Sequence, residues 1–333
     1  MNATSLEYLL QQVQAGDRVA LGQAITLIES EAPEKRAHSS ALLAALPKQK
    51  ERAVSVGISG VPGAGKSTLI EALGMRLVSR GKRVAVLAVD PSSGRSGGSI
   101  MADKTRMTQL ARDERAFVRP SPASGALGGV ARQTHAAMQL VEAAGFDVIL
   151  IETVGVGQSE TLVEGLVDFF LVLMLAGAGD ELQGIKRGIL ELADGLAINK
   201  ADGENRSAAE VARAQYEGSL QLLLPKSGAW KPRALCVSAL EGTGLDELWA
   251  LVEDHGCALA ASGELDERRR ERRCTWMWQL VEDGLLRMLR TDEAVKMLGD
   301  ELEGKVREGK LPPETAADRI TAAFRGFPKS GCE

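Results

Sequence analysis

The chain of 333 residues is poor in aromatic residues, which make up 4% of it, and it has only four cysteines and three histidines. A scarcity of aromatic side chains argues against a surface that stacks on the bases of single-stranded nucleic acid. The formal net charge of −5 argues equally against a broad basic surface for nucleic acid. We therefore expect no nucleic-acid partner.

Disulfide bonds and membrane spans are also unexpected. The four cysteines show no C-x-x-C spacing, which is typical of a reducing compartment rather than a disulfide framework. No apolar run reaches the roughly 18 residues that a membrane-spanning helix needs. Residues 1–10 include an acidic residue and no cationic segment, so they do not resemble a signal peptide. We expect a soluble, cytoplasmic protein that does not contact a membrane.

What the chain does have is a glycine-rich run that fits the phosphate-loop pattern G-x-x-x-x-G-K-[ST]. The run, which Thr68 follows, consists of Gly60, Val61, Pro62, Gly63, Ala64, Gly65, Lys66 and Ser67. An apolar segment typical of a strand precedes it at 54–59, and an amphipathic segment typical of a helix follows at 68–77. Backbone N–H groups at the start of that helix would bind phosphate. Lys66 would reach the β- and γ-phosphates, and Ser67 would ligate Mg²⁺.

A second motif predicts which base is bound. The run Asn199, Lys200, Ala201 and Asp202 places a carboxylate where it can accept from N1–H and the 2-amino group of guanine, and adenine has neither donor. Asn199 can bond the other edge of the ring, and the Lys200 stem can cover its face. Downstream, Ser238, Ala239 and Leu240 resemble the loop whose backbone amide meets guanine O6. The sequence therefore predicts a site for GTP and GDP.

The apolar runs predict an α/β fold with a mostly parallel sheet. Continuous apolar segments suit strands that are covered on both faces by helices. They occupy residues 54–59, 84–89, 148–151, 169–175, 196–198 and 234–237. The remaining sequence is helical in pattern at both ends, so we expect a helical extension at 1–50, a P-loop GTPase domain at 51–258 and a helical arm at 259–333. The charged run at 268–273 is interpreted as a solvated helix face.

Acidic residues follow several of these strands, where ligands bind in parallel sheets. Asp90 could hold a Mg²⁺-bound water, and Asp103 lies in a glycine-rich segment of the kind that orders around γ-phosphate and Mg²⁺. Glu152 and Gly155 stand where many GTPases have D-x-x-G, whose acid contacts Mg²⁺ and whose glycine amide bonds the γ-phosphate. We predict Ser67, Asp90, Asp103 and Glu152 as metal ligands.

A third loop, residues 177–188, carries glycines, acids and a basic pair. Lys186 or Arg187 could stabilise charge on the nucleotide. The predicted catalytic residues are therefore Lys66, Asp90, Asp103, Glu152 and Lys186. No glutamine follows Gly155 directly, so we expect slow hydrolysis by the protein alone.

These motifs together resemble the methylmalonyl-CoA mutase-associated GTPases, the MeaB/ArgK group, over nearly the whole chain. The resemblance is carried by residues 57–68, 89–93, 97–100, 103–107, 119–122, 152–160, 177–186 and 199–202. It implies a homodimeric GTPase that binds an adenosylcobalamin-dependent acyl-CoA mutase, gates cofactor loading by an adenosyltransferase, and protects or reactivates the mutase. It also implies that the mutase stimulates hydrolysis. The family's Mg²⁺ and switch residues map onto Lys66, Ser67, Asp90, Asp103 and Glu152, and its third switch maps onto Asp180 and Lys186.

Three alternatives remain open from the sequence. A nickel-insertion GTPase of the same fold family would need clustered cysteine and histidine ligands, and here both residue types are scattered. A P-loop kinase would need an acceptor site with a base near the γ-phosphate. A protein that GTP only locks into one shape would need no hydrolysis at all.

Overall fold

The computed structural model describes residues 3–30, 32–47, 53–89, 107–121, 127–153, 159–176, 187–223 and 226–326. Contacts divide the chain into two compact units, Met1–Arg272 and Arg273–Glu333. The first unit contains the sheet and all of the predicted nucleotide-binding residues that the structure describes.

The first unit is built on a seven-stranded sheet in the order β3-β2-β4-β1-β5-β6-β7, and every pairing is parallel. The strands are β1 (Val54–Gly60), β2 (Val84–Val89), β3 (Ala116–Ser121), β4 (Val148–Thr153), β5 (Phe169–Leu175), β6 (Gly195–Asn199) and β7 (Arg233–Cys236). From β1 the chain passes to β2, β3 and β4, which all lie on one side of β1 in the sheet. It then crosses to β5, β6 and β7 on the other side, so the strand order reverses at β1. Ligands bind at such a switch point, outside the carboxyl ends of the strands.

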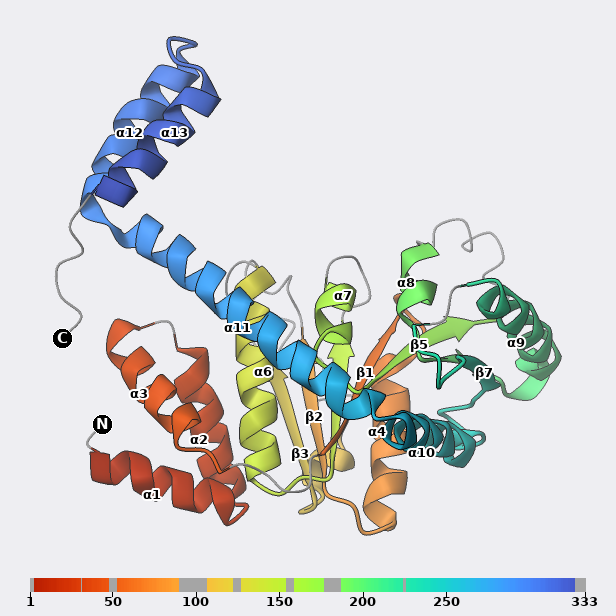
Figure 1. Cartoon of the computed structure of the whole chain (residues 1–333). Helices are drawn as coiled ribbons and strands as arrows, with labels where there is room; N and C mark the ends of the chain where they lie inside the picture. The colour runs from red at the N-terminus through yellow and green to blue at the C-terminus, as the bar shows by residue number, and fades with distance from the viewer. Residues whose placement is uncertain are drawn as a thin grey trace. The chain divides into compact units, whose positions relative to one another are not determined.

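Helices cover both faces of the sheet, as Figure 1 shows. One face packs against α4 (Lys66–Ser79) and α10 (Leu245–Ser262). The other packs against α6 (Leu127–Ala143), α7 (Ser159–Glu164), α8 (Arg187–Leu192) and α9 (Arg206–Gln221). Short 3₁₀ turns lie at η2 (Leu110–Arg112) and η4 (Gly203–Asn205). Each predicted strand is therefore present, and the predicted fold class is confirmed.

The N-terminal helices are α1 (Ala3–Gln14), α2 (Arg18–Glu29) and α3 (Pro33–Ala44). Asp17 caps α2, because its side chain accepts a hydrogen bond of 2.7 Å from the Ala20 amide. The apolar face of α2 packs against α6 (Figure 1), so these helices share the core of the sheet. At the sheet edge, Arg119 of β3 donates to Glu29 of α2 at 2.6 Å.

Strand β3 is an element that the sequence analysis does not predict. Its run is interrupted by Pro120, which has no N–H to donate and weakens the signature of a strand. The structure pairs β3 with β2 alone, at the edge of the sheet. An edge strand tolerates proline because one of its sides has no ladder to maintain.

The interpretation of residues 268–273 as a solvated helix face is wrong for two of the arginines. Helix α11 (Glu264–Thr291) brings Arg269 and Arg272 onto Asp168, which directly precedes β5. Arg269 donates to the two carboxylate oxygens at 2.9 and 2.7 Å, and Arg272 donates at 2.6 Å. Arg270 pairs with Glu267 on the surface, as expected for a solvated face.

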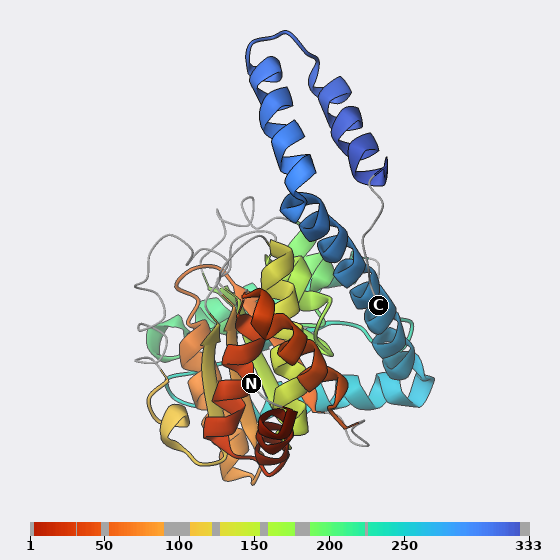
Figure 2. The same ribbon diagram turned by 90° about the vertical axis from the view of Figure 1, so that its left-hand side faces the viewer.

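The second unit is helical and comprises the later part of α11, then α12 (Glu293–Arg307) and α13 (Pro313–Gly326). Helices α12 and α13 lie side by side and antiparallel in both Figure 1 and Figure 2. Val295, Leu302 and Ala316 are buried within this unit. The prediction of a helical C-terminal region is confirmed.

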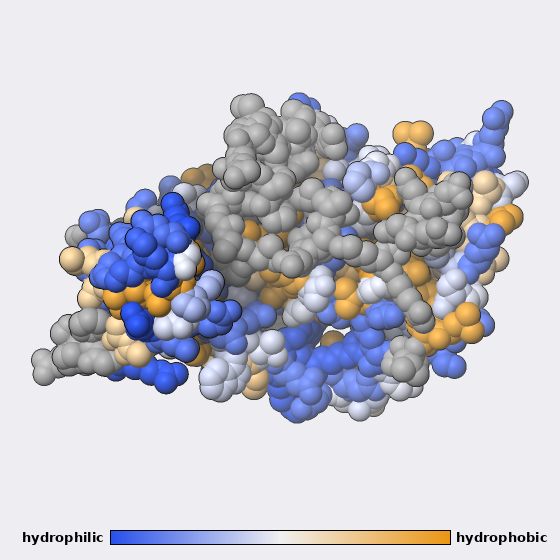
Figure 3. Space-filling view, turned by 90° about the horizontal axis from the view of Figure 1, so that it is seen from above, coloured by the Kyte–Doolittle hydropathy of each residue, from blue (hydrophilic) through white to orange (hydrophobic). Residues whose placement is uncertain are grey.

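No helix among the described residues is both long and apolar enough to cross a membrane. On the face that Figure 3 shows, outside the grey residues, hydrophobic side chains are scattered among hydrophilic ones. In the described part of the chain Cys236, Cys257 and Cys274 are free thiols.

Candidate nucleotide-binding site

The glycines of the phosphate loop are required by its backbone. Gly60 ends β1 with a φ of 150°, and a Cβ there would stand 2.4 Å from the Leu173 carbonyl oxygen. Gly65 has a φ of 86° as the N-cap of α4, and its Cβ would stand 2.7 Å from the side-chain nitrogen of Asn199. Gly63 also has a positive φ, 79°, but has open space beside it. Only glycine meets both the dihedral and the steric demands at residues 60 and 65.

Lys66 points back into this loop from the first turn of α4. Its ammonium group donates to the carbonyl oxygens of Gly60 at 2.8 Å and Val61 at 3.3 Å. Burial lowers the pKa of Lys66, while the charges of Glu152 and Glu160 act in the opposite direction. A lysine that donates to two carbonyl oxygens of this loop could exchange them for the phosphate oxygens that the loop would bind.

Ser67 and Glu152 meet at the same end of the sheet. The Ser67 hydroxyl donates to a carboxylate oxygen of Glu152 at 2.7 Å, and both residues are under a tenth exposed. One side chain comes from α4 and the other from β4, the neighbour of β1. Adjacent hydroxyl and carboxylate oxygens are the donors that Mg²⁺ prefers, so the pair fits the predicted metal.

Asn199 joins the phosphate loop to the predicted base-recognition loops. Its side chain donates to the Ala64 carbonyl at 2.7 Å and accepts from the Ala239 amide at 3.3 Å. The residue is fully buried at the end of β6. A single amide thereby fixes the distance between the loop that would bind phosphate and the loop that would bind the base.

The Asp202 carboxylate is oriented by Ser238. The Ser238 hydroxyl donates to it at 2.5 Å and accepts from the Glu241 amide at 3.0 Å. Lys200 is exposed with a φ of 60°, and the Asn205 side chain donates to its carbonyl at 2.7 Å. Holding a non-glycine residue in the left-handed region requires such support.

The structure thus brings together most of the predicted site residues that it describes. The carboxyl ends of β1, β4 and β6 carry the phosphate loop, Glu152 and Asn199, and Ser238 follows β7 at the same edge. Pro62, Thr68, Lys200 and Leu240 are solvent-exposed around this edge. Five predicted residues, Asp90, Asp103, Gly155, Asp180 and Lys186, lie outside the described residues.

Three residues make hydrogen bonds at this edge although the sequence motifs do not assign them to the site. They are Asn205, which supports Lys200, and the hydrogen-bonded pair Ser59 and Glu160. Ser59 directly precedes the phosphate loop, and Glu160 ends the run 152–160 quoted for the family resemblance. Proximity to a motif is the sequence signal available for all three residues, since Asn205 lies three residues after Asp202.

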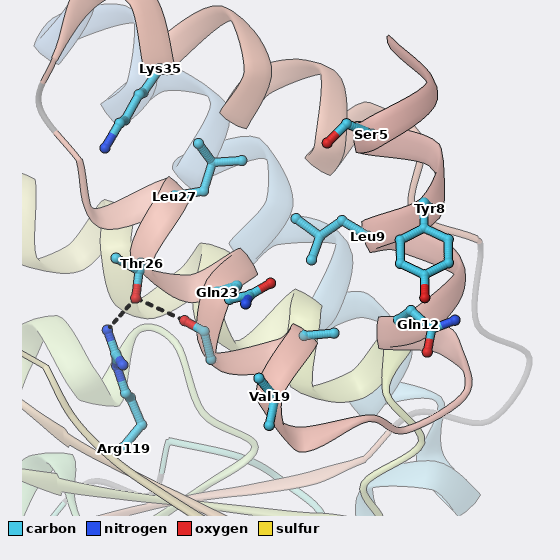
Figure 4. Close-up of a pocket in the computed structure, with 12 residues that line it drawn as sticks. Ser5, Tyr8, Leu9, Gln12, Val19, Gln23, Thr26, Leu27, Lys35 and Arg119 are labelled. Atoms are coloured by element: carbon cyan, nitrogen blue, oxygen red, sulfur yellow. Dashed lines mark hydrogen bonds between the residues drawn. The ribbon is translucent and has the colours of Figure 1, made fainter. Parts of the chain in front are cut away.

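A separate pocket of about 600 Å³ lies among the N-terminal helices (Figure 4). Its lining includes Tyr8 and Leu9 of α1, Val19 and Thr26 of α2, and Arg119 of β3. Arg119 donates to the Thr26 hydroxyl at 3.1 Å, which ties the edge of the sheet to α2. None of the predicted nucleotide-binding residues lines this pocket, so it is distinct from the candidate site.

The class of protein follows from the sheet order and the loops at its carboxyl edge, which are those of P-loop nucleotide-binding proteins. The family model described as "Methylmalonyl Co-A mutase-associated GTPase MeaB" matches residues 21–294, and the chain belongs to this family. The predicted family resemblance is confirmed. Membership of a GTPase family also confirms the predicted binding of guanine nucleotide and the predicted hydrolysis of GTP.

Individual relatives are similar over most of their lengths. A Mycobacterium tuberculosis protein named as a probable GTPase is 52% identical over 316 residues, which cover 95% of this chain and 94% of that one. The Escherichia coli "GTPase ArgK" is 44% identical, covering 96% and 97%. The mouse "Methylmalonic aciduria type A homolog, mitochondrial" is 45% identical, covering 93% and 77%.

A solved structure shares the fold over the whole chain. The crystal structure of a protein titled "LAO/AO transport system kinase" has a TM-score of 0.76 and 38% identity, covering 98% of this chain and 99% of that one. Its title assigns kinase activity to that protein.

Proposed function

We propose that this GTPase is a chaperone of an adenosylcobalamin-dependent mutase, methylmalonyl-CoA mutase or a related acyl-CoA mutase. It would gate loading of the cobalamin cofactor and protect or reactivate the mutase. The observation that carries the proposal is the family match over residues 21–294, whose description names association with methylmalonyl-CoA mutase. The name of the mouse relative, which refers to methylmalonic aciduria, points to the same metabolism.

The described residues support separate roles in binding the phosphates, the metal ion and the base. The ammonium group of Lys66 would bind the β- and γ-phosphates in place of the carbonyls that it now contacts. Ser67 and Glu152 would hold Mg²⁺, which neutralises charge on the phosphates when bound. Asp202, oriented by Ser238, would accept from the two donors of guanine.

The same proposal includes Asp90 and Asp103 as further metal ligands, Gly155 as a donor to the γ-phosphate and Lys186 as a charge stabiliser. No glutamine follows Gly155 directly, so hydrolysis would be slow until the mutase binds and completes the site. Stimulation by the partner would then couple GTP turnover to cofactor loading.

We further propose that residues 259–333 form a dimerisation arm that a second copy of the chain covers. The later part of α11 exposes large apolar side chains, among them Trp278, which is 61% exposed, and Leu285, which is 47% exposed. Leu286 and Met288 extend this apolar surface along the same helix. Clustered exposure of this kind marks an interaction surface. Analytical ultracentrifugation should give a dimer for the wild type and a monomer for Leu285→Glu. Val211→Glu on α9 is the control, because Val211 is 59% exposed and lies outside the arm.

The decisive experiment measures GTP turnover by the protein alone and with purified adenosylcobalamin-dependent methylmalonyl-CoA mutase. We expect a slow basal rate that the mutase raises strongly. Lys66→Ala should abolish turnover in both conditions, and Lys82→Ala, which changes an exposed lysine, should leave both rates intact. An unchanged rate with methylmalonyl-CoA mutase and with related acyl-CoA mutases would contradict the chaperone proposal.

The alternatives predict different results. A kinase would transfer labelled γ-phosphate to an acceptor other than water. A metal-insertion GTPase would bind nickel or zinc stoichiometrically, yet within the described ranges no three histidine, cysteine or acidic residues gather in a metal-holding arrangement. Equal hydrolysis of ATP and GTP would contradict the assigned role of Asp202.

A further inference from the structure

Helix α7 is fastened to β1 at two points. Gly57 lies against the helix so closely that a Cβ would stand 2.9 Å from a methyl carbon of Val163. Two residues later on the same face of the strand, the fully buried Ser59 hydroxyl donates to the Glu160 carboxylate at 3.0 Å. The first turn of α7 is therefore held to the residue that immediately precedes the phosphate loop.

Glu160 also acts on the lysine of that loop. Its negative charge raises the pKa of Lys66, in the same sense as Glu152 and against the dominant effect of burial. Glu152 accepts a hydrogen bond from Ser67 of the loop itself, whereas Glu160 accepts one from Ser59, the strand residue just before the loop. Glu160 thus combines a hydrogen bond to β1 with a charge that Lys66 experiences.

We propose that Glu160 is a positioning residue that makes the attachment of α7 to β1 depend on whether GTP or GDP is bound. The inference rests on the proposed phosphate site at residues 60–67. A γ-phosphate adds negative charge beside Lys66, and a carboxylate close to the same lysine is repelled by that charge. The repulsion weakens the Ser59–Glu160 hydrogen bond in the triphosphate state and leaves it intact in the diphosphate state.

Two substitutions separate the charge from the attachment. Glu160→Gln keeps an oxygen that can accept from Ser59 but removes the negative charge. Ser59→Ala keeps the charge and removes the donor. Glu164→Gln makes the same charge change one turn later on α7, where the native residue pairs with Lys226 at 2.7 Å, and serves as the matched control.

The experiment measures the dissociation constants of GDP and of a non-hydrolysable GTP analogue, both with Mg²⁺, for the full-length protein. Glu160→Gln should favour the GTP analogue over GDP by about 3- to 10-fold relative to wild type, because it removes the repulsion. The change should shrink as salt is raised. Ser59→Ala removes a bond that is weaker in the triphosphate state, so it should shift the ratio in the same direction by a smaller factor. Glu164→Gln should leave the ratio within about twofold of wild type.

Amide hydrogen exchange of α7 gives a second readout. In wild type, residues 159–164 should exchange faster with the GTP analogue than with GDP, and Glu160→Gln should abolish this difference. An unchanged affinity ratio in Glu160→Gln, or an equal shift in Glu164→Gln, would overturn the inference while leaving nucleotide binding intact. Failure of the wild type to bind GTP, or unimpaired binding by Lys66→Ala, would instead overturn the proposed phosphate site and this inference with it.

Discussion

Replacing Asp168 with asparagine removes one charge from a largely buried cluster that joins α11 to the sheet. The Asp168 side chain is 11% exposed and pairs with Arg269 and Arg272, whose side chains are 17% and 23% exposed. It also accepts from the Ser55 hydroxyl of β1 at 3.1 Å. Asparagine has nearly the same shape, so the substitution tests the charge rather than the packing.

The pKa of Asp168 indicates how much this charge contributes. Burial acts to raise the pKa, but the hydrogen bond from Arg269 and the charges of Arg272 and Arg269 outweigh it and lower the value from 3.8 to about 2. The ionised form is therefore preferred more strongly in the folded protein than in the unfolded chain. At about 1.4 kcal/mol for each pKa unit, the difference corresponds to about 2 kcal/mol of stability.

The sign of the pH dependence follows from the lowered pKa. The stabilisation is fully present above the unfolded value near 4 and is lost as the pH falls through about 2. At neutral pH, Asp168→Asn should reduce the free energy of unfolding by about 3 kcal/mol, because two arginines lose their charged partner. Between pH 5 and pH 2 the deficit of the variant relative to wild type should shrink by about 2 kcal/mol.

Urea unfolding followed by circular dichroism, with wild type and variant measured in parallel at each pH, tests this reasoning. Asp246→Asn is the matched control, since Asp246 also pairs with two arginines, Arg76 and Arg80, but on the exposed surface. Its substitution should hardly move the midpoint, because solvent screens such pairs. A deficit of Asp168→Asn that stays constant from pH 5 to pH 2 would refute the role assigned to the carboxylate.

Three further predictions follow from the structure. Gly65→Ala should weaken GTP binding far more than Gly63→Ala. Both glycines have a positive φ, but only the Cβ at Gly65 would clash, 2.7 Å from the side-chain amide of Asn199. Isothermal titration calorimetry compares the two variants, and equal losses of affinity would contradict the steric argument. Asn205→Ala should raise the dissociation constants of GTP and GDP alike by about 10-fold through loss of the bond that supports Lys200, and unchanged values would refute that role. Within the described residues neither ring nitrogen of the buried His255 has a hydrogen-bond partner, and burial lowers the pKa of this histidine. The folded protein therefore loses stability as the pH falls below 6.5, the pKa of histidine in the unfolded chain. His255→Leu should show less of this loss between pH 7 and pH 5 in thermal unfolding, and equal losses in both proteins would exclude the histidine as its source.

Much of the fold could be predicted because its signals are local. A strand buried on both faces must be apolar throughout, so β2, β4 and β5 were recognisable as continuous apolar runs. The phosphate loop was recognisable because its backbone permits only glycine at residues 60 and 65. The residues of the predicted guanine motif come from one short run, and the structure places Asn199 beside the phosphate loop and Asp202 beside Ser238.

What could not be predicted depends on partners that are distant in the sequence. A run of arginines has the same local pattern whether its side chains face water or pair with a buried carboxylate. Arg269 and Asp168 are 101 residues apart in the sequence, so no local pattern indicates that they pair. The role of Asn205 depends on the backbone dihedral of Lys200, which no composition rule specifies. Strand β3 was missed because Pro120 is acceptable only at an edge, and the position of a strand in a sheet is a property of the whole topology.

Strand β1 shows how such long-range partners leave a trace in the sequence. Val56 and Ile58 face the core that α4 shares, whereas Ser55, Gly57 and Ser59 face the opposite side. A strand at the centre of a sheet is buried on both faces, so each of its polar side chains needs a hydrogen-bond partner within the protein. Ser55 binds the carboxylate that anchors α11, Gly57 admits α7, and Ser59 binds Glu160 beside the phosphate loop. The small and polar residues of β1 therefore mark where other elements are attached, and Ser55→Ala and Ser59→Ala should loosen different helices, α11 and α7 respectively.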